Sequence, residues 1–237
     1  MKIAHVLPVN VSKERINNIK SKLTPNLFPD TQLDIITYQE GPKDLEYYTY
    51  EHLAIDLMIK DKERLNSYDA ISIACFYDPG VRELRELLNI PVIGISQASI
   101  LLAQVYGHNS AIIVSRDKNL PKMKDNMFLY GFSDHISVWQ SLDLTVQQLN
   151  RIDQAELLSS TSKLIKEAIE IYKSEVIILG CGALSGLEDE LIQKFQMPII
   201  NPIVAGIKMA ETLASLRKTA QLTTSKLYDY ENKYLHF

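Results

Sequence analysis

The sequence predicts an α/β protein made of two pseudo-symmetric lobes, each a four-stranded parallel sheet flanked by helices. The first observation is an alternation of short β-branched runs with longer polar stretches that carry apolar residues at helical spacing, such as Leu84, Leu87 and Leu88. The second is a segment of about 25 residues that recurs in the second half of the chain. The 237 residues, 46% of them apolar, suffice for one large core or two small ones.

Eight runs have the length and composition of strands, four in each half of the chain. In order they are 2–7, 32–37, 70–74, 91–95, 110–115, 135–139, 175–180 and 198–201. The polar segments between them have the length of crossover helices, which predicts parallel pairing with right-handed connections.

The internal repeat divides these strands into two sets. Residues 71–75, which end at Cys75, are echoed by residues 177–181, which end at Cys181. A glycine stands five residues after each cysteine, and a helical stretch then leads to an apolar strand opened by proline. The cysteine-to-proline spacing differs by only one residue between the halves. Such a repeat implies two related half-structures rather than one eight-stranded sheet or barrel.

We expect the first lobe to comprise residues 1–96 together with 203–237, and the second to comprise residues 97–202. The last helix, expected at about 203–218, would return to pack on the first lobe. Because no low-complexity linker separates the lobes, we expect a tight pair with a cleft between them.

Charge and composition exclude several classes of function. The net charge of −4 argues against a general nucleic-acid binder, which needs a basic face to displace counterions from phosphate. No apolar run has the roughly 20 residues that cross a bilayer, and the N-terminal segment resembles a strand rather than a signal peptide. We therefore expect a cytoplasmic protein with a small-molecule substrate and two reduced thiols, and without a membrane or nucleic-acid partner.

No metal or nucleotide cofactor is expected. The two cysteines have no neighbouring Cys or His at a zinc spacing, and the five histidines show neither metal spacing nor the order of a catalytic triad. None of the glycine motifs matches a phosphate-binding loop or a complete dinucleotide-binding fingerprint.

Each cysteine ends an apolar strand, where ligands of open α/β sheets collect. A helix-start signal follows in each half: Asp78 as an N-cap before Pro79, and residues 185–188 as a capping box. The amide groups and partial positive charge of a helix N-terminus stabilise a thiolate and bind an anion. Asp78 is thus expected to cap a helix rather than to serve as an acid or base.

A single cysteine is more often a small buried apolar residue than a catalyst. Packing alone does not explain why the only two cysteines occupy matched strand ends. Two opposed groups of one type suit the removal of a proton from one face of a carbon and its return to the other face.

Three motifs carry a resemblance to a known family. Residues 74–80, Ala-Cys-Phe-Tyr-Asp-Pro-Gly, lead to Pro-Val-Ile-Gly-Ile at 91–95; residues 178–187 read Ile-Leu-Gly-Cys-Gly-Ala-Leu-Ser-Gly-Leu; and residues 41–46 read Gly-Pro-Lys-Asp-Leu-Glu. In this order they resemble the aspartate/glutamate/hydantoin racemase superfamily, in its hydantoin and allantoin racemase branch. The resemblance covers nearly the whole chain.

The resemblance implies a homo-oligomeric isomerase with an active site between the lobes, without metal or pyridoxal phosphate. It implies that Cys75 and Cys181 are the catalytic pair and that the enzyme racemises a hydantoin-type or allantoin-like substrate. Phe76 stands where glutamate racemases usually have Asn or Thr, which favours a ring or an uncharged substrate.

Six further positions are expected to contact substrate. Phe76 and Gly182 follow the two cysteines, and the backbone amides there would hold carbonyl oxygens. Ser115 ends the fifth strand and either donates to a substrate carbonyl or caps the strand. The remaining three are Ser96 and Gln97 after the fourth strand, and Asn10 in the first loop, a place where Asn more often forms a turn.

The sequence departs from the family pattern at a few positions near the expected cleft. Leu7 and Val9 replace residues of an Asn-Pro-Asn motif, Gln97 stands where Glu is common, and Gly182-Ala183 inverts the usual pair. These departures concern the identity of the substrate rather than the two-thiol chemistry.

Two other functions remain open at this stage. The same fold supports related cysteine-dependent enzymes, which isomerise maleate by thiolate addition or decarboxylate malonates. A non-catalytic two-lobed protein that binds a small molecule is the alternative outside enzymes, and its thiols would be inert.

Overall fold

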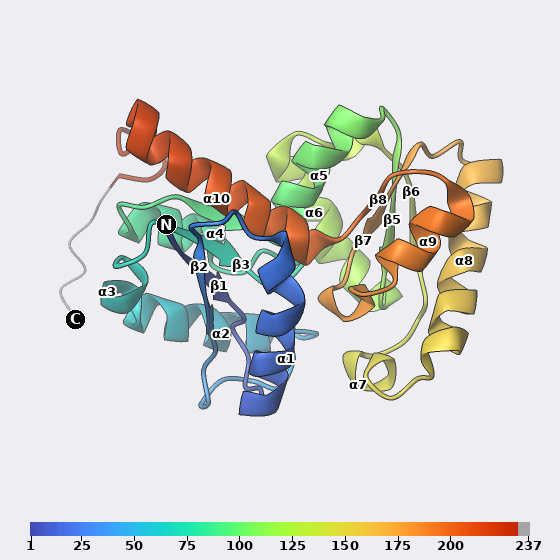
Figure 1. Cartoon of the computed structure of the whole chain (residues 1–237), viewed down its shortest axis with the longest axis horizontal. Coiled ribbons are helices and arrows are strands. Elements are labelled where there is room, and N and C mark those ends of the chain that lie inside the picture. The colour runs from blue at the N-terminus through green and yellow to red at the C-terminus, as the bar shows by residue number, and fades with distance from the viewer. Residues whose placement is uncertain (232–237) are drawn as a thin grey trace. The chain divides into compact units, whose positions relative to one another are not determined.

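The structure is a computed structural model that describes residues 1–231; residues 232–237, at the end of the first expected lobe, lie outside the described part. Contacts divide the chain into two compact units. One comprises Met1–Gly94 and the chain from Gly206 onward, and the other comprises Ile95–Ala205. Each unit contains one sheet with helices on both sides of it (Figure 1).

The first unit contains a parallel sheet in the order β2-β1-β3-β4. Its strands are β1 (Lys2–Val6), β2 (Gln32–Ile36), β3 (Ala70–Ile73) and β4 (Val92–Gly94). Its helices are α1 (Lys13–Leu23), η1 (Thr24–Asn26), α2 (Tyr48–Lys60), α3 (Lys62–Leu65) and α4 (Val81–Leu87), together with most of α10 (Pro202–Ala220).

The second unit repeats this order as β6-β5-β7-β8, again with parallel pairing. Its strands are β5 (Ser110–Val114), β6 (Ile136–Ser141), β7 (Val176–Leu179) and β8 (Ile199–Ile200). Its helices are α5 (Ile95–Tyr106), η2 (Asp117–Asn119), α6 (Leu120–Tyr130), η3 (Ser133–His135), α7 (Val146–Leu149), α8 (Gln154–Glu170), η4 (Gly182–Leu184) and α9 (Glu188–Phe195). The predicted fold class of two four-stranded parallel sheets flanked by helices is confirmed.

Strand register shows how closely the two sheets correspond. In the first unit Val6 pairs with Ile73, and in the second Ile113 pairs with Leu179. With β1 matched to β5 and β3 to β7, Cys75 corresponds to Cys181. The repeat seen in the sequence is therefore a repeat of backbone pairing as well.

Equivalent strand positions face equivalent helix layers. In the first unit, Ala4, Val6, Ile71 and Ile73 pack with apolar residues of α2, α3 and α4, among them Met58, Leu65 and Leu84. The equivalent residues of the second unit, Ala111, Ile113, Ile177 and Leu179, pack with residues of α7, α8 and α9, among them Leu149, Ile165 and Leu191. Alternate side chains of each strand face the helices, and the apolar side chains of each helix repeat every 3.6 residues on the side that faces the sheet. Each unit therefore has its own core.

Helix α10 is anchored to the first unit by a buried carboxylate. Glu211 is fully buried and accepts a 2.8 Å hydrogen bond from the backbone N–H of Phe28, in the loop between η1 and β2. Lys208, one turn earlier, pairs with Glu211 at 2.9 Å and lies over the ring of Phe28. The last helix begins at Pro202, one residue before its expected start.

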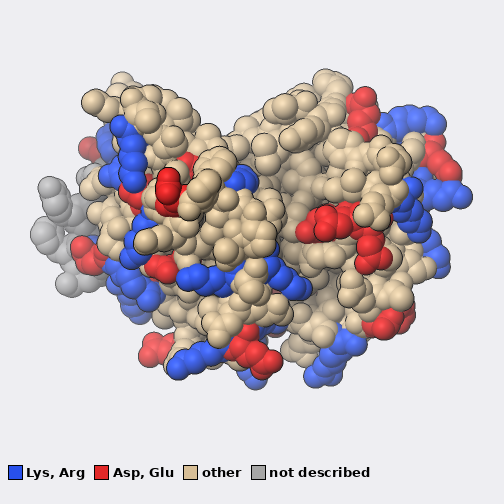
Figure 2. Space-filling model, in the orientation of Figure 1, with Lys and Arg blue, Asp and Glu red and all other residues tan. Residues whose placement is uncertain are grey.

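Acidic and basic side chains are interspersed on the face of the molecule drawn in Figure 2, without a large region of one sign. Among residues 1–231, no helix combines the length and the apolar character required to cross a bilayer.

Candidate active site

Cys75 and Cys181 occupy the same position relative to their sheets, two residues beyond β3 and β7. The residue before each cysteine continues the pairing of its strand. The backbone N–H of Ala74 donates to Val6 O at 2.8 Å, and that of Gly180 donates to the equivalent Ile113 O at 2.7 Å. Both thiols therefore lie at the carboxyl end of a central strand, where open parallel sheets collect ligands. Both are half-buried.

The chain makes the same turn after each cysteine. The carbonyl of Cys75 accepts from Asp78 N at 2.9 Å, and the carbonyl of Cys181 accepts from Leu184 N at 3.0 Å. Gly80 and Gly186 follow in the left-handed region, with φ of 71° and 106°. A glycine enters that region without steric penalty, which explains the glycine five residues after each cysteine.

The surroundings of Cys75 include a backbone donor and a buried phenol. The backbone N–H of Tyr77 donates to Cys75 Sγ at 3.5 Å. Burial raises the pKa of Tyr77 above its usual range, and nearby negative charge, on Cys75 first and then on Tyr48, Glu51 and Glu46, raises it further. The phenol therefore keeps its proton over the pH range in which thiols titrate.

Asp78 is not the N-cap residue that the sequence predicts. Helix α4 begins at Val81, and its N-cap is Gly80. The carboxyl group of the buried Asp78 lies instead against Gly94, where a Cβ atom would come within 2.0 Å of Asp78 Cγ. This position requires φ of 50° at Asp78, a left-handed conformation that Asp adopts more readily than most residues.

The capping box predicted at residues 185–188 is also wrong. Helix α9 begins at Glu188 without a side-chain cap. Ser185 donates its hydroxyl to Asn201 Oδ1 at 3.1 Å, and Glu188 accepts from the backbone N–H of Gly186 at 2.6 Å. The left-handed turn at Gly186 separates the two ends of the expected box, so its residues bond to other partners.

The structure places the residues expected to contact substrate as follows. Phe76 is buried beside Cys75, and Gly182 is half-buried beside Cys181, near Ile203. Ser115 directly follows β5 and accepts a 2.9 Å hydrogen bond from Asn119 Nδ2. Because the amide NH2 group of Asn119 donates and cannot accept, the hydroxyl proton of Ser115 points elsewhere.

The other three candidates differ in their exposure. Asn10 is exposed, and its side chain donates to Gln39 O at 2.5 Å, which ties the first loop to the loop after β2. Ser96 and Gln97 lie in the first turn of α5, because this helix begins directly after β4. Ser96 is buried and Gln97 half-buried.

Asn201 was missed by the sequence analysis. It directly follows β8 and precedes Pro202, the first residue of α10. An Asn-Pro pair at the end of an apolar strand is a helix-start signal, N-cap followed by proline, and so offered a means of finding it. Within residues 1–231, no group of three or more His, Cys, Asp or Glu side chains has the arrangement of a metal site.

Two parallel α/β units with a cysteine at the same strand end in each define a class of duplicated α/β proteins. Within that class, residues 5–210 match the pattern described as Asp/Glu/hydantoin racemase. The chain belongs to this family.

Individual relatives agree with the assignment. A hydantoin racemase of Rhizobium meliloti is 34% identical over 197 residues, which cover 81% of this chain and 78% of the relative. A hydantoin racemase of Pseudomonas sp. strain NS671 is 30% identical over 211 residues, or 87% of this chain and 83% of the relative. Among solved structures, an allantoin racemase from Pseudomonas fluorescens has a TM-score of 0.90 and 25% identity, over 100% of this chain and 99% of that one.

Proposed function

We propose that this protein is a cofactor-independent racemase that acts on a hydantoin-type or allantoin-like substrate, with Cys75 and Cys181 as its acid and base. The observation that carries the proposal is the matched position of the two cysteines at the ends of β3 and β7. The similarity to hydantoin and allantoin racemases supports the choice of substrate class.

The proposed reaction transfers one proton in and one proton out. One cysteine, as a thiolate, removes the proton from a carbon next to a carbonyl, and the C–H electron pair becomes an enolate with its charge on the oxygen. The other cysteine, as a thiol, then gives its proton to the opposite face of that carbon. The two sulfurs end with exchanged protonation states, and the reverse reaction uses them in the opposite roles.

Donors aimed at the enolate oxygen would lower the barrier, because charge develops there in the transition state. We assign this role to the backbone amides at Phe76 and Gly182 and to the hydroxyl of Ser115. The bond from Asn119 to Ser115 Oγ supports this assignment, since it orients the hydroxyl as a donor to another group. Ser96, Gln97 and Asn10 are proposed to contact the rest of the substrate.

Proton exchange in heavy water tests the proposal. Single enantiomers of 5-substituted hydantoins, allantoin and free amino acids are incubated with the protein, and optical rotation and mass are followed together. We expect the rotation to vanish as one deuterium enters the stereocentre. Absence of exchange with every compound would contradict the proposal and would favour a binding protein with inert thiols.

The same samples distinguish the other enzyme chemistries. A covalent adduct on a cysteine during turnover would indicate thiolate addition, as in a maleate isomerase, and release of carbon dioxide from malonates would indicate decarboxylation. Neither product is expected from a racemase.

Single-cysteine variants test the division of roles. In Cys75→Ala, Cys181 remains to remove a proton from one face and to return deuterium to that same face. We expect this variant to exchange one enantiomer with retention, Cys181→Ala to exchange the other, and both to lose racemisation by roughly 10²- to 10⁴-fold. Exchange of the same enantiomer by both variants would show that the thiols do not act on opposite faces.

A further inference from the structure

We propose that Asn201 is a positioning residue that holds the turn carrying Cys181, so that the sulfur keeps its place during proton transfer. This inference rests on the proposed role of Cys181. We do not assign Asn201 a direct contact with either cysteine. It acts on Cys181 through residues 182–188.

Asn201 makes hydrogen bonds in three directions. Its Oδ1 accepts from the backbone N–H groups of Ile203 and Val204, at 2.9 and 3.3 Å, and so caps α10. The same oxygen accepts from Ser185 Oγ at 3.1 Å. Its Nδ2 donates to Glu188 Oε1 at 2.7 Å.

These bonds close a ring around the segment after Cys181. Glu188 uses its second oxygen to accept from Gly186 N at 2.6 Å, so Ser185, Gly186 and Glu188 are all fixed by one side chain and its partner. Ser185 and Gly186 continue directly from the turn in which Leu184 N bonds to Cys181 O. The turn is thus held at its start by β7 and at its end by Asn201.

The first turn of α10 also lies near the residue that follows Cys181. A Cβ atom on Gly182 would lie 3.5 Å from Ile203 Cδ1, which is ordinary van der Waals contact. Because Asn201 caps this turn of α10, it sets the position of Ile203 as well. Asn201 therefore restrains the Cys181 turn through hydrogen bonds and fixes the part of α10 that lies nearest to it.

The first unit contains a counterpart built from different residues. By strand register Gly94 is the equivalent of Asn201, since Ile71 pairs with Val92 and Ile177 with Ile199. Gly94 has no side chain, and the carboxyl group of Asp78 fills that space from the turn after Cys75. In each unit, then, one short polar side chain lies between the cysteine turn and the end of the next strand: Asp78 in the first unit and Asn201 in the second. This recurrence with different residues favours a requirement of the site over chance packing.

The variant that tests this role is Asn201→Ser. Serine is a good N-cap, so α10 keeps its cap while the bonds to Ser185 and Glu188 are lost. Misplacement of a reacting group by about 1 Å can slow a reaction 100-fold. We expect kcat of racemisation to fall by roughly 10- to 100-fold with little change in KM, and Cys181 to react faster with iodoacetamide while the rate for Cys75 stays unchanged.

A rescue experiment separates positioning from general damage. Asn201→Asp alone places a carboxylate opposite Glu188, and we expect it to be impaired. Adding Glu188→Gln restores the hydrogen bond in the reverse direction, because the new amide donates and the new carboxylate accepts. We expect the double variant to recover both kcat and the slow alkylation of Cys181.

Asp153→Ala is the matched control, since Asp153 caps α8 in the same unit by accepting from Ala155 N and Glu156 N. We expect it to leave kcat and both alkylation rates unchanged. The proposal is overturned if Asn201→Ser keeps the wild-type kcat and Cys181 alkylation rate, or if Asp153→Ala reproduces its effects. The alkylation rate of Cys181 measures how firmly the turn is held, even if Cys181→Ala retains racemisation. Failure of this inference can therefore be distinguished from failure of the proposed function.

Discussion

The backbone N–H of Tyr77 donates a hydrogen bond to the Sγ atom of Cys75 across 3.5 Å. The donor belongs to the main chain, so every substitution at residue 77 except proline retains it. A cysteine near a donor of this kind is stabilised as the thiolate, the form that removes a proton.

Replacement of Tyr77 by Phe separates this backbone donor from the buried phenol. Burial and nearby negative charge raise the pKa of Tyr77, so the phenol is neutral over the whole working range. We expect Tyr77→Phe to leave the alkaline limb of the pH–rate profile and the pH midpoint for alkylation of Cys75 in place. A shift of either midpoint would indicate that the hydroxyl, rather than the main chain, supports the thiolate.

The buried imidazole of His5 makes the stability of the fold depend on pH. It lies fully buried in β1, with Nδ1 3.2 Å from Ser72 Oγ, and burial lowers its pKa from 6.5 to about 4. Below pH 6.5 the unfolded chain therefore binds a proton that the folded chain does not. We expect the free energy of unfolding to decrease by about 3 kcal/mol as the pH falls from 6.5 to 4, and to gain nothing from His5 above that window.

The matched variants are His5→Gln and His52→Gln, measured by urea denaturation between pH 4 and 7. Glutamine can bond to Ser72 but does not titrate in this range, so the slope of stability against pH should flatten in His5→Gln. His52 is exposed on α2, and its replacement should leave the slope unchanged. Equal slopes in His5→Gln and wild type would contradict the assignment.

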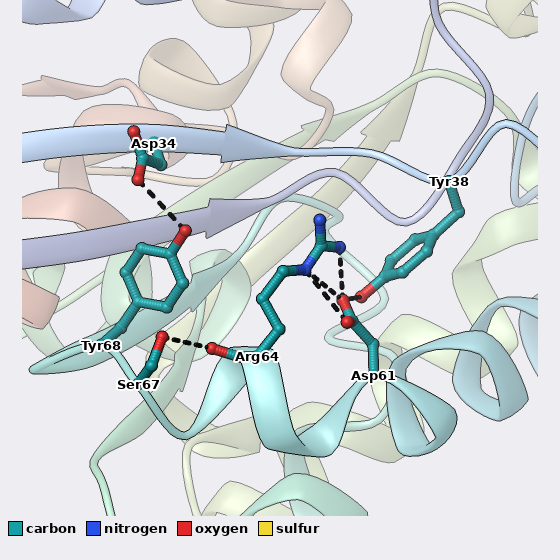
Figure 3. A network of polar contacts seen from close by, with 6 residues as sticks. All are labelled: Asp34, Tyr38, Asp61, Arg64, Ser67 and Tyr68. Atoms are coloured by element: carbon teal, nitrogen blue, oxygen red, sulfur yellow. Dashed lines mark hydrogen bonds and ion pairs between the residues drawn. The ribbon is translucent and has the colours of Figure 1, made fainter.

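Tyr38 links the loop after β2 to the junction of α2 and α3. Its hydroxyl donates to Asp61 Oδ2 at 3.0 Å, and Arg64 donates to the same carboxylate through Nε at 2.9 Å (Figure 3). Burial, and then the charge of Asp61, raises the pKa of Tyr38, which keeps the hydroxyl as a donor. The backbone of Tyr38 bonds to Val9 O and Gly41 N, so the tether extends into both neighbouring loops.

We expect Tyr38→Phe to destabilise the protein by about 1–2 kcal/mol, toward the low end for a hydrogen bond to a charged group because the pair is only partly buried. Hydrogen exchange should quicken in residues 39–46. Ser67→Ala is the control, because Ser67 lies in the same region but its hydroxyl donates to the exposed backbone carbonyl of Arg64, at 2.7 Å, and not to a charged side chain. Equal losses in the two variants would show that the tether to Asp61 contributes nothing specific.

The sequence predicted the strands, their division into two sheets and the matched cysteines because these features repeat and are local. Apolar runs and the spacing between Cys75 and Gly80 can be read directly from the sequence. The partners of Asp78 and Ser185 cannot be read in this way, because each bonds or packs against a residue that only strand pairing brings near. Asp78 looked like an N-cap because Asp-Pro is typical of helix starts, yet the space over Gly94 is what its carboxyl group fills.

The contact between Asp78 and Gly94 gives the last prediction. A methyl group at residue 94 would come within 2.0 Å of Asp78 Cγ and within 2.2 and 2.5 Å of its two carboxyl oxygens. Such overlap forces the buried carboxylate or the backbone to move, so we expect Gly94→Ala to lose about 1–3 kcal/mol of stability. Gly182→Ala, where the nearest atom is 3.5 Å away, should unfold at nearly the wild-type temperature.

A double-mutant cycle measures the contact itself. Asp78→Gly removes the carboxyl group and suits the left-handed φ of 50° at that position. If the cost of Gly94→Ala comes from overlap with Asp78, adding the methyl group to Asp78→Gly should cost far less than adding it to the wild type, since contacting residues couple. Additive losses would show instead that the methyl group at residue 94 is opposed by atoms other than the carboxyl group of Asp78.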